Sequence, residues 1–156
     1  MDIGSGTGYP SAALSNFAPH PFIMDGVLCN SMEGFLQSLK FKDPETQKQV
    51  CLLVGKAAKF KGKKKKWWRE QKLYWQGIEY ERASEAYQIL LDRAFVALAQ
   101  NESFAKALLA TGDAVLTHSI GKTKETETVL TRREFCSRLT FIRTALRLEI
   151  VKEAET

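Results

Sequence analysis

The helical spacing of apolar residues in the second half of the chain is the feature that most limits its fold. Between Glu81 and Ala99, apolar residues recur every three or four positions, so they fall on one side of a helix with 3.6 residues per turn. The stripe consists of Ala83, Ala86, Tyr87, Leu90, Leu91, Ala94, Phe95 and Leu98. We therefore expect a long helix whose apolar side packs into the core of a mainly helical domain.

Helix start signals predict further helices on both sides of this one. Asp43 before Pro44 predicts a helix start, because aspartate caps free N–H groups and proline fits the first helical position. Helical spacing of apolar residues then continues from Val50 to Ala58. Thr131 and Glu134 have the spacing of a capping box and predict a last helix. Its predicted buried face is Phe135, Leu139, Ile142, Leu146 and Ile150.

Strand signals are few and lie near the two ends of the chain. Asp25-Gly26 stands between two short apolar runs and predicts a hairpin, since glycine tolerates the positive φ of a tight turn. Residues 114–120, AVLTHSI, are typical of a short strand, and a polar loop follows over 121–128. The 156 residues contain no linker that would divide them. We predict one compact domain over residues 1–156, mostly α with minor β (α+β).

Positive charge is concentrated in one stretch of the chain. The net charge is +5, but residues 59–72 alone carry +7, so the remainder carries −2. Lysines alternate there with Trp67, Trp68, Tyr74 and Trp75. Lysines contact phosphates and exposed aromatic rings stack on bases, so the patch from Lys59 to Trp75 predicts nucleic-acid or dinucleotide binding. The alternative is a solvated lysine loop that its tryptophans anchor to the core, although adjacent tryptophans cannot easily both face inward on one helix.

The remaining composition argues against several other classes of protein. Cys29, Cys51 and Cys136 are odd in number and widely spaced, which favours reduced, mostly buried thiols over disulfides or a metal site. No uninterrupted apolar run reaches about 18 residues, and the N-terminus lacks the pattern of a secretory signal. We expect a cytoplasmic protein with no membrane partner and no cofactor or metal. The sequence does not indicate an oligomeric state.

The stretch SMEGFLQSLKF, residues 31–41, carries the residues best suited to chemistry. At 100° per residue on a helix, Glu33, Gln37 and Lys40 form a polar stripe beside an apolar face. Such a stripe is either a solvated surface or one wall of a pocket. In a pocket, a partly buried carboxylate near a cation suits general-base catalysis.

Two sequence blocks resemble a known family. The first runs Ser15-Asn16-Phe17-Ala18-Pro19, Pro21-Phe22, Asp25-Gly26, and the second consists of Ser31, Glu33, Gln37, Lys40 and Phe41. Together they resemble the NADAR (YbiA-like) pattern of L-S-N-F, P, P-F, D-G followed by S-x-E-x-x-x-Q-x-x-K-F. Further similar positions are Gln100-Asn101, Leu108-Leu109, Thr111-Gly112 and Arg143, so the resemblance spans about residues 14–146.

The resemblance implies an N-glycosidase. Members of the family are similar to enzymes that hydrolyse ribosyl–nitrogen bonds, and the glutamate of the second block is taken as catalytic. This implies Glu33 as the catalytic carboxylate, and we expect Lys40 and His118 to assist it. The expected substrate-binding residues are Asn16, Phe17, Gly26, Gln37, Trp67, Trp75, Gly121 and Arg143.

Three substrate interpretations remain open at the level of sequence. The first is ADP-ribose attached to guanine in nucleic acid, and the second is a ribosylamino-pyrimidine phosphate of the riboflavin pathway. The third is a binding module for ADP-ribose or nucleic acid that has lost catalysis. The chain departs from the family pattern after Thr111-Gly112, where HSIGKTKETETVLTRREF replaces D-x-x-W-G and G-x-N-x-L-G. This departure affects the substrate more than the fold.

Overall fold

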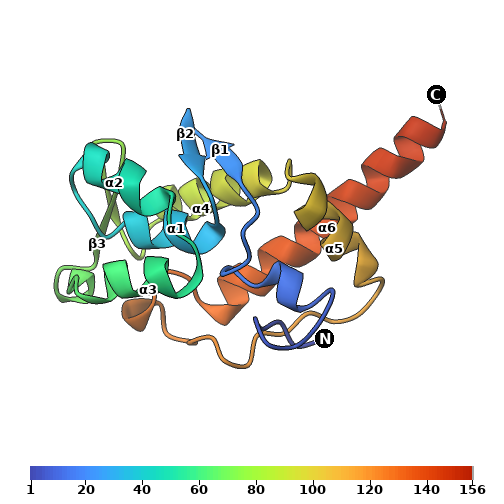
Figure 1. Cartoon of the computed structure of the whole chain (residues 1–156), viewed down its shortest axis with the longest axis horizontal. Coiled ribbons are helices and arrows are strands. Elements are labelled where there is room, and N and C mark those ends of the chain that lie inside the picture. Colours follow the sequence, from blue (N-terminus) through green and yellow to red (C-terminus); the bar gives the residue numbers. More distant parts are fainter. Residues whose placement is uncertain (156) are drawn as a thin grey trace.

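Six α-helices and two small hairpins build the part of the chain that the computed structural model describes, residues 1–155 (Figure 1). The helices are α1 Met32–Ser38, α2 Pro44–Cys51, α3 Gly55–Lys63, α4 Glu85–Leu98, α5 Glu102–Ala110 and α6 Arg132–Ala154. The strands are β1 Phe22–Met24, β2 Val27–Cys29, β3 Lys72–Trp75 and β4 Ile78–Glu81. Short 3-10 turns lie at Ala12–Leu14, Trp67–Arg69 and Glu125–Glu127. The predicted α+β class with a majority of helix is confirmed.

Both hairpins turn on a dipeptide that ends in glycine. Asp25 and Gly26 have φ values of 47° and 77°, and Gln76 and Gly77 have φ values of 50° and 83°. Two consecutive positive φ values match the right-handed twist of the paired strands, so the turn is short and tight. The β1–β2 hairpin is the predicted one. The β3–β4 hairpin was not predicted, and its position in mid-chain makes the expectation of β structure near both ends wrong.

The helices form two groups around a shared core (Figure 1). Helices α1, α2 and α3 pack together on one side, and α5 packs on α6 on the other. Aromatic rings meet in this core, where Phe35 of α1 lies edge-on to Trp75 of β3 and Phe95 of α4 packs against Phe135 of α6. The C-terminal end of α6 extends away from this body (Figure 1).

A buried ion pair fixes the start of α6 to the middle of the chain. Arg82 is completely buried and donates to both Glu134 carboxylate oxygens, at 3.0 and 2.6 Å. Its guanidinium lies 4.9 Å from the ring centre of Tyr87, and the Tyr87 hydroxyl donates to the Val129 carbonyl. Glu134 also completes the predicted capping box with Thr131. The loop before α6 is therefore held at several points.

Three helix predictions differ from the structure in length. The long helix predicted from Glu81 begins at Glu85, because Glu81 is the last residue of β4, and Ala83 and Ala86 of its predicted apolar stripe are exposed. The helix predicted to continue from Pro44 to Ala58 breaks after Cys51, and α3 begins at Gly55, whose φ is +54°. Helix α1 ends at Ser38, short of Phe41, and the following turn is closed by bonds from Lys40 N to Gln37 O and Phe41 N to Ser38 O. Lys40 therefore lies just beyond the helix.

Two other predictions are wrong. Residues 114–120 do not form a strand, because Thr117 alone makes an isolated bridge with Asp2. Val115 and Ile120 are 77% and 75% exposed, so this segment has no sheet to pack into. Ile150 is not part of the buried face of α6, because the helix has left the body by that point and Ile150 is exposed. The three cysteines are free thiols, as predicted.

Candidate active site

Helix α1 is positioned by backbone groups from two other parts of the chain. Ser31 caps it by accepting from Gly34 N at 3.0 Å and donates its own hydroxyl to the Leu53 carbonyl at 3.0 Å. The Glu33 N–H donates to the Asn16 carbonyl at 3.0 Å. A Cβ on Gly34 would stand 2.6 Å from the Leu53 carbonyl oxygen, so only glycine lets α1 approach this closely. Two of the predicted residues, Asn16 and Glu33, are thus joined.

Glu33 is a half-buried carboxylate. Burial raises its pKa above the ordinary 4.5, while a hydrogen bond from Gln37 and the charges of Lys40, Lys59 and His118 act against that rise. The Gln37 amide donates to Glu33 Oε1 at 2.8 Å. Within residues 1–155 no close ion pair involves Glu33. The carboxylate is therefore oriented by an amide and surrounded by cations without being neutralised by one of them.

The cations around Glu33 come from three different segments. Lys40 follows α1, and burial lowers its pKa while the charge of Glu33 raises it and that of Lys122 lowers it. Lys59 is on α3 and Lys122 is in the loop before α6. Their electrostatic effects on Glu33 and Lys40 mean that α1, α3 and this loop converge here. Sequence reasoning identified Lys40 but missed Lys59 and Lys122, because only the fold brings them near α1.

His118 approaches the site with one ring nitrogen already committed. Its Nδ1 lies 2.8 Å from the Ile3 carbonyl, which can only accept, so Nδ1 carries the hydrogen and Nε2 is left for other chemistry. The ring lies edge-on to Phe135 at 5.0 Å. A Cβ on Gly121 would stand 2.5 Å from His118 Cδ2, so the glycine allows the loop to lie against the imidazole. The Gly121 carbonyl accepts from Arg132, which holds the loop.

Gln37 is wedged between α1 and α3. It is 7% exposed, and a Cβ on Gly62 of α3 would stand 1.8 Å from Gln37 Oε1. Because the Gln37 amide nitrogen donates a hydrogen bond to Glu33, Gln37 can position the carboxylate. This role differs from the substrate binding that the sequence predicted for Gln37. The Oδ1 of Asn16 and the Oε1 of Gln37 are both buried and accept no hydrogen bond from the described chain. Because Gln37 Oε1 lies against Gly62, Asn16 Oδ1 is the oxygen left for a sugar hydroxyl. The sequence alone did not identify this close approach of Gly62.

Several predicted substrate-binding residues lie elsewhere in the fold. Gly26 forms the β1–β2 turn, and Trp75 is in the core with its indole N–H donating to Asp25 at 2.8 Å. Trp67 is also buried, whereas Trp68 is 51% exposed, in agreement with the expectation for adjacent tryptophans. Buried Arg143 donates to Thr111 Oγ1 and the Ala114 carbonyl, so it ties α6 to the end of α5.

Phe17 is half-buried and lies next to the break between α2 and α3. A Cβ added to Gly55 would stand 3.9 Å from the Phe17 ring. It lies directly after Asn16, whose carbonyl holds the first turn of α1. Among residues 1–155 no three His, Cys, Asp or Glu side chains lie close enough together to hold a metal ion.

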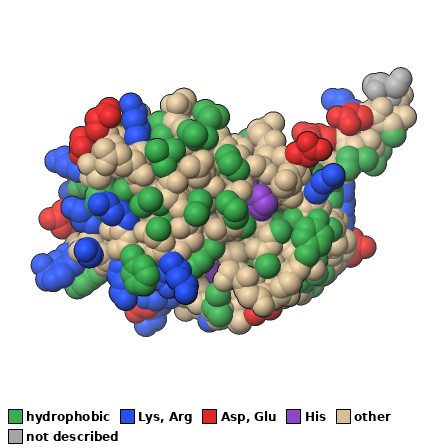
Figure 2. Space-filling view, in the orientation of Figure 1, with side chains coloured by type: hydrophobic (Ala, Val, Ile, Leu, Met, Phe, Trp, Pro, Cys, Tyr) green, Lys and Arg blue, Asp and Glu red, His purple; other side chains and the backbone are tan. Residues whose placement is uncertain are grey.

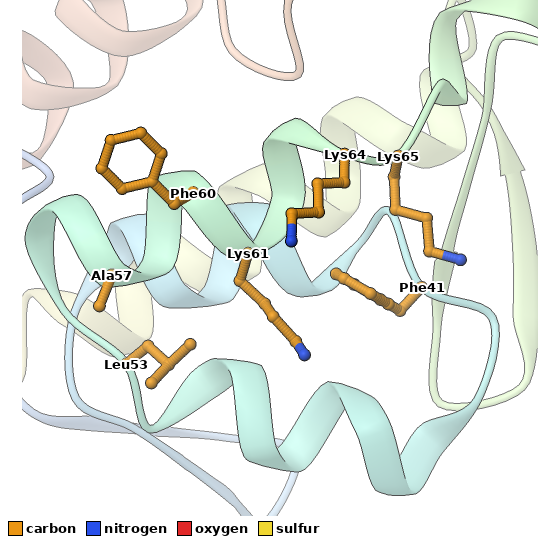
Figure 3. Close-up of a pocket in the computed structure, with 7 residues that line it drawn as sticks. All are labelled: Phe41, Leu53, Ala57, Phe60, Lys61, Lys64 and Lys65. Carbon is orange, nitrogen blue, oxygen red and sulfur yellow. The ribbon is translucent and has the colours of Figure 1, made fainter.

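A basic groove runs along the side of α3 that faces away from Glu33 (Figure 3). Its volume is about 400 Å³, and its lining consists of Phe41, Leu53, Ala57, Phe60, Lys61, Lys64 and Lys65. The Lys65 ammonium lies 5.1 Å from the ring centre of Phe41. Figure 2 shows lysine and arginine side chains gathered at this end of the molecule. Helix α3 thus separates the groove from the site, with Lys59 and Gly62 facing Glu33 and Gln37.

Fold and site together define a YbiA-like α+β domain with a carboxylate set among cations. The NMR structure of the E. coli protein YbiA is similar over 97% of this chain and 86% of the YbiA chain, with a TM-score of 0.62 at 19% sequence identity. The family model described as bacteriophage protein GP30.3 matches residues 8–144, and the chain belongs to this family. It is 41% identical over 152 residues to a phage T4 protein named "Uncharacterized 17.1 kDa protein in Gp30-rIII intergenic region", covering 94% of this chain and 98% of that protein. The predicted membership of the NADAR (YbiA-like) superfamily is confirmed.

Proposed function

We propose that this protein is an N-glycosidase that hydrolyses a ribosyl–nitrogen bond, with ADP-ribose attached to guanine in nucleic acid as its substrate. The observation that carries the proposal is the state of Glu33. It is half-buried, oriented by Gln37 and close to several cations, and its pKa is raised by burial. A carboxylate with a raised pKa accepts a proton more readily than an exposed one, as a general base must.

The proposed reaction uses one water molecule. Glu33 removes a proton from the water, whose oxygen forms a bond to C1 of the ribose as the bond from C1 to the base nitrogen breaks. The transition state is oxocarbenium-like, so the carboxylate also stabilises positive charge on the sugar. His118 in its protonated form gives its Nε2 proton to the departing nitrogen. The products are free ADP-ribose and an unmodified base.

The surrounding cations suit a substrate that carries phosphate. Lys40, Lys59 and Lys122 act electrostatically on one small region, and together they can balance the negative charge of a pyrophosphate. A buried carboxylate alone would repel such a substrate, and the three cations offset that repulsion. Asn16 Oδ1 can accept a hydrogen bond from a ribose hydroxyl.

The basic groove favours a substrate that is part of a nucleic acid. Lys61, Lys64 and Lys65 line it, and Trp68 and Phe60 expose 51% and 59% of their surface nearby in the chain. Phosphates of a strand would contact these lysines while bases stack on the exposed rings. Exposed Trp68 takes the stacking role that the sequence suggested for Trp67 and Trp75. A ribosylamino-pyrimidine phosphate, the second candidate, would not need such a groove.

The test is a product assay on both substrate classes. Purified protein is incubated with an oligonucleotide ADP-ribosylated on guanine and separately with a ribosylamino-pyrimidine phosphate, and released ribose products are measured by mass spectrometry. We expect release from the oligonucleotide and a fall of about 100-fold or more in Glu33→Gln, the usual effect of losing a general base. Glu45→Gln, at an exposed position of α2, is the control and should keep full activity.

Other outcomes separate the alternatives. Equal release by wild type and Glu33→Gln would remove Glu33 from the mechanism. Release from the pyrimidine substrate alone would identify the riboflavin-pathway alternative. Wild type that binds ADP-ribose in calorimetry but cleaves no N-riboside would be the non-catalytic binding module.

A further inference from the structure

The last helix presents an apolar stripe to solvent. Ser137, Phe141, Thr144, Leu148 and Val151 follow one another at alternating spacings of four and three, and all five are exposed. The apolar members Phe141, Leu148 and Val151 are 74%, 66% and 55% exposed. Alternating three and four is the spacing by which one helix packs along another. No helix of the described chain covers this stripe, since its members remain open to solvent.

The end of α6 also lacks support from the body. Residues 148–155, here named the α6 arm, are all exposed, and they project beyond the other helices (Figure 1). Figure 2 shows hydrophobic as well as charged side chains on this projection. A helix end of about two turns has little stability of its own in water, because most helical stability comes from packing. A helix that exposes leucine and valine here therefore suits a packing partner.

The body offers a groove beside the same stripe. It lies between α4 and α6, has a volume of about 430 Å³, and Phe95, Val96, Phe141 and Ile142 contribute its apolar lining. Val96 on α4 is 57% exposed. The groove and the arm are complementary in kind, since one is an apolar hollow and the other an apolar ridge. The arm cannot fold back onto the groove of its own chain, because the arm continues α6, the helix that forms one wall of that groove.

We propose that α6 pairs with α6 of a second copy of this chain, antiparallel, around a two-fold axis at Thr144. Each arm then lies over the α4–α6 groove of the other copy, an isologous interface. Counting residue by residue outward from Thr144, Ser137 faces Val151 of the second copy. Phe141 lies one residue, about 1.5 Å along the helix axis, from the level of Leu148, so these two apolar side chains lie side by side. An antiparallel pair places the two bodies at opposite ends, so they do not compete for the same space.

Charge at the ends of the stripe agrees with this register. The same counting places Arg133 of one copy opposite Glu155 of the other, and both residues are exposed. This complementary pair occurs twice in the two-fold arrangement, once at each end. In a parallel, in-register pair, Arg133 would instead face Arg133, and like charges would repel.

The first test is the oligomeric state in solution. Sedimentation velocity and light scattering of the full chain at micromolar concentration should give a dimer. Leu148→Glu and Phe141→Glu should each raise the dissociation constant by about thirtyfold or more, the usual effect at the centre of an interface. Ile23→Glu, at the exposed position of β1, is the control and should remain dimeric, and far-ultraviolet circular dichroism checks that each variant is folded.

The second test fixes the direction of pairing. In a Cys136→Ser background, Thr144→Cys should form an intermolecular disulfide on mild oxidation, because it faces itself across the axis. Val151→Cys should not, since it would face itself only in a parallel pair. Arg133→Glu should weaken dimerisation, and combining it with Glu155→Arg should restore it.

A wild-type chain that is monomeric throughout overturns the proposal, as does a dimer that survives both glutamate variants. Disulfide formation by Val151→Cys, whether or not Thr144→Cys also forms one, overturns the antiparallel arrangement. None of these outcomes depends on catalysis, so they are independent of the proposed hydrolase activity.

Discussion

At the scale of single residues, the candidate active site lowers the stability of the folded protein. The carboxylate of Glu33 is held where burial raises its pKa, so its charged form is less stable in the folded protein than in the unfolded chain. The hydrogen bond from Gln37 and the nearby positive charges offset part of this cost. A residue that is kept in an unfavourable state by its surroundings is typical of a functional site.

This loss of stability predicts that Glu33→Gln stabilises the fold. Because the folded pKa is above 4.5, the folded state holds the proton more tightly, and stability falls as pH rises from below 4.5 through that raised pKa. Glutamine carries no charge and escapes the loss. Thermal unfolding should therefore give Glu33→Gln a higher Tm than wild type at neutral pH, with the difference vanishing at about pH 4. A variant less stable than wild type at neutral pH would contradict this reading of the site.

A second residue-scale prediction concerns Lys40. Its positive charge lowers the pKa of Glu33, so Lys40→Met should raise that pKa further. The acidic limb of the plot of kcat/KM against pH should then move upward, by roughly one pH unit. Lys42→Met, at an exposed position two residues away, should leave the limb unchanged. If both substitutions shift the limb equally, the effect comes from general surface charge and not from the charge of Lys40 next to Glu33.

The sequence predicted the residues of α1 and could not predict what surrounds them. Glu33 and Gln37 fall on one helical stripe because they are four residues apart, which is a local property. Lys59 and Lys122 reach the same place only through the packing of α3 and of the loop before α6. Gly62 is equally invisible in the sequence, since its role depends on the distance to Gln37.

At the scale of elements, caps and turns were predictable and long-range interruptions were not. Asp43 and Thr131 cap their helices as expected, because capping depends on three or four consecutive residues. The break between α2 and α3 was missed, since apolar spacing continues across it. Its cause is tertiary: the carbonyls of Val50, Cys51 and Leu53 turn toward α1 at Gly34.

That junction yields a prediction on Gly34. Alanine normally favours a helix over glycine by about 1 kcal/mol, but a Cβ here would press on three backbone carbonyls. Backbone cannot move as a side chain can, so Gly34→Ala should destabilise the fold by about 1–3 kcal/mol. Gly6→Ala, where a Cβ meets nothing within 4 Å, is the control. Denaturant unfolding measures both, and a Gly34→Ala variant as stable as wild type would show that the packing of α1 is looser than described.

At the scale of the whole molecule, the basic groove and the candidate active site lie on opposite sides of α3. One side of α3 carries Lys59 and Gly62 next to Glu33 and Gln37, and the groove lies on the other side. In the proposed complex, the neighbouring nucleotides of the strand rest in the groove, and only the modified base crosses to Glu33. The +7 charge of residues 59–72 is thus divided between the two sides of α3, with Lys59 near Glu33 and Lys61 and Lys64 in the groove.

The last prediction follows from the release of counterions. Each lysine–phosphate contact to a single strand contributes about 0.7 to the slope of log K against log salt concentration. The double variant Lys61→Ala with Lys64→Ala should therefore lower the slope by about 1.4. The matched variant Lys48→Ala with Lys106→Ala removes the same charge from α2 and α5 and should change it little. Fluorescence anisotropy with an unmodified single-stranded oligonucleotide across a salt series measures both. Equal slopes in the two variants would mean that net charge, and not the groove, attracts nucleic acid, and the strand would then have to reach Glu33 by another surface.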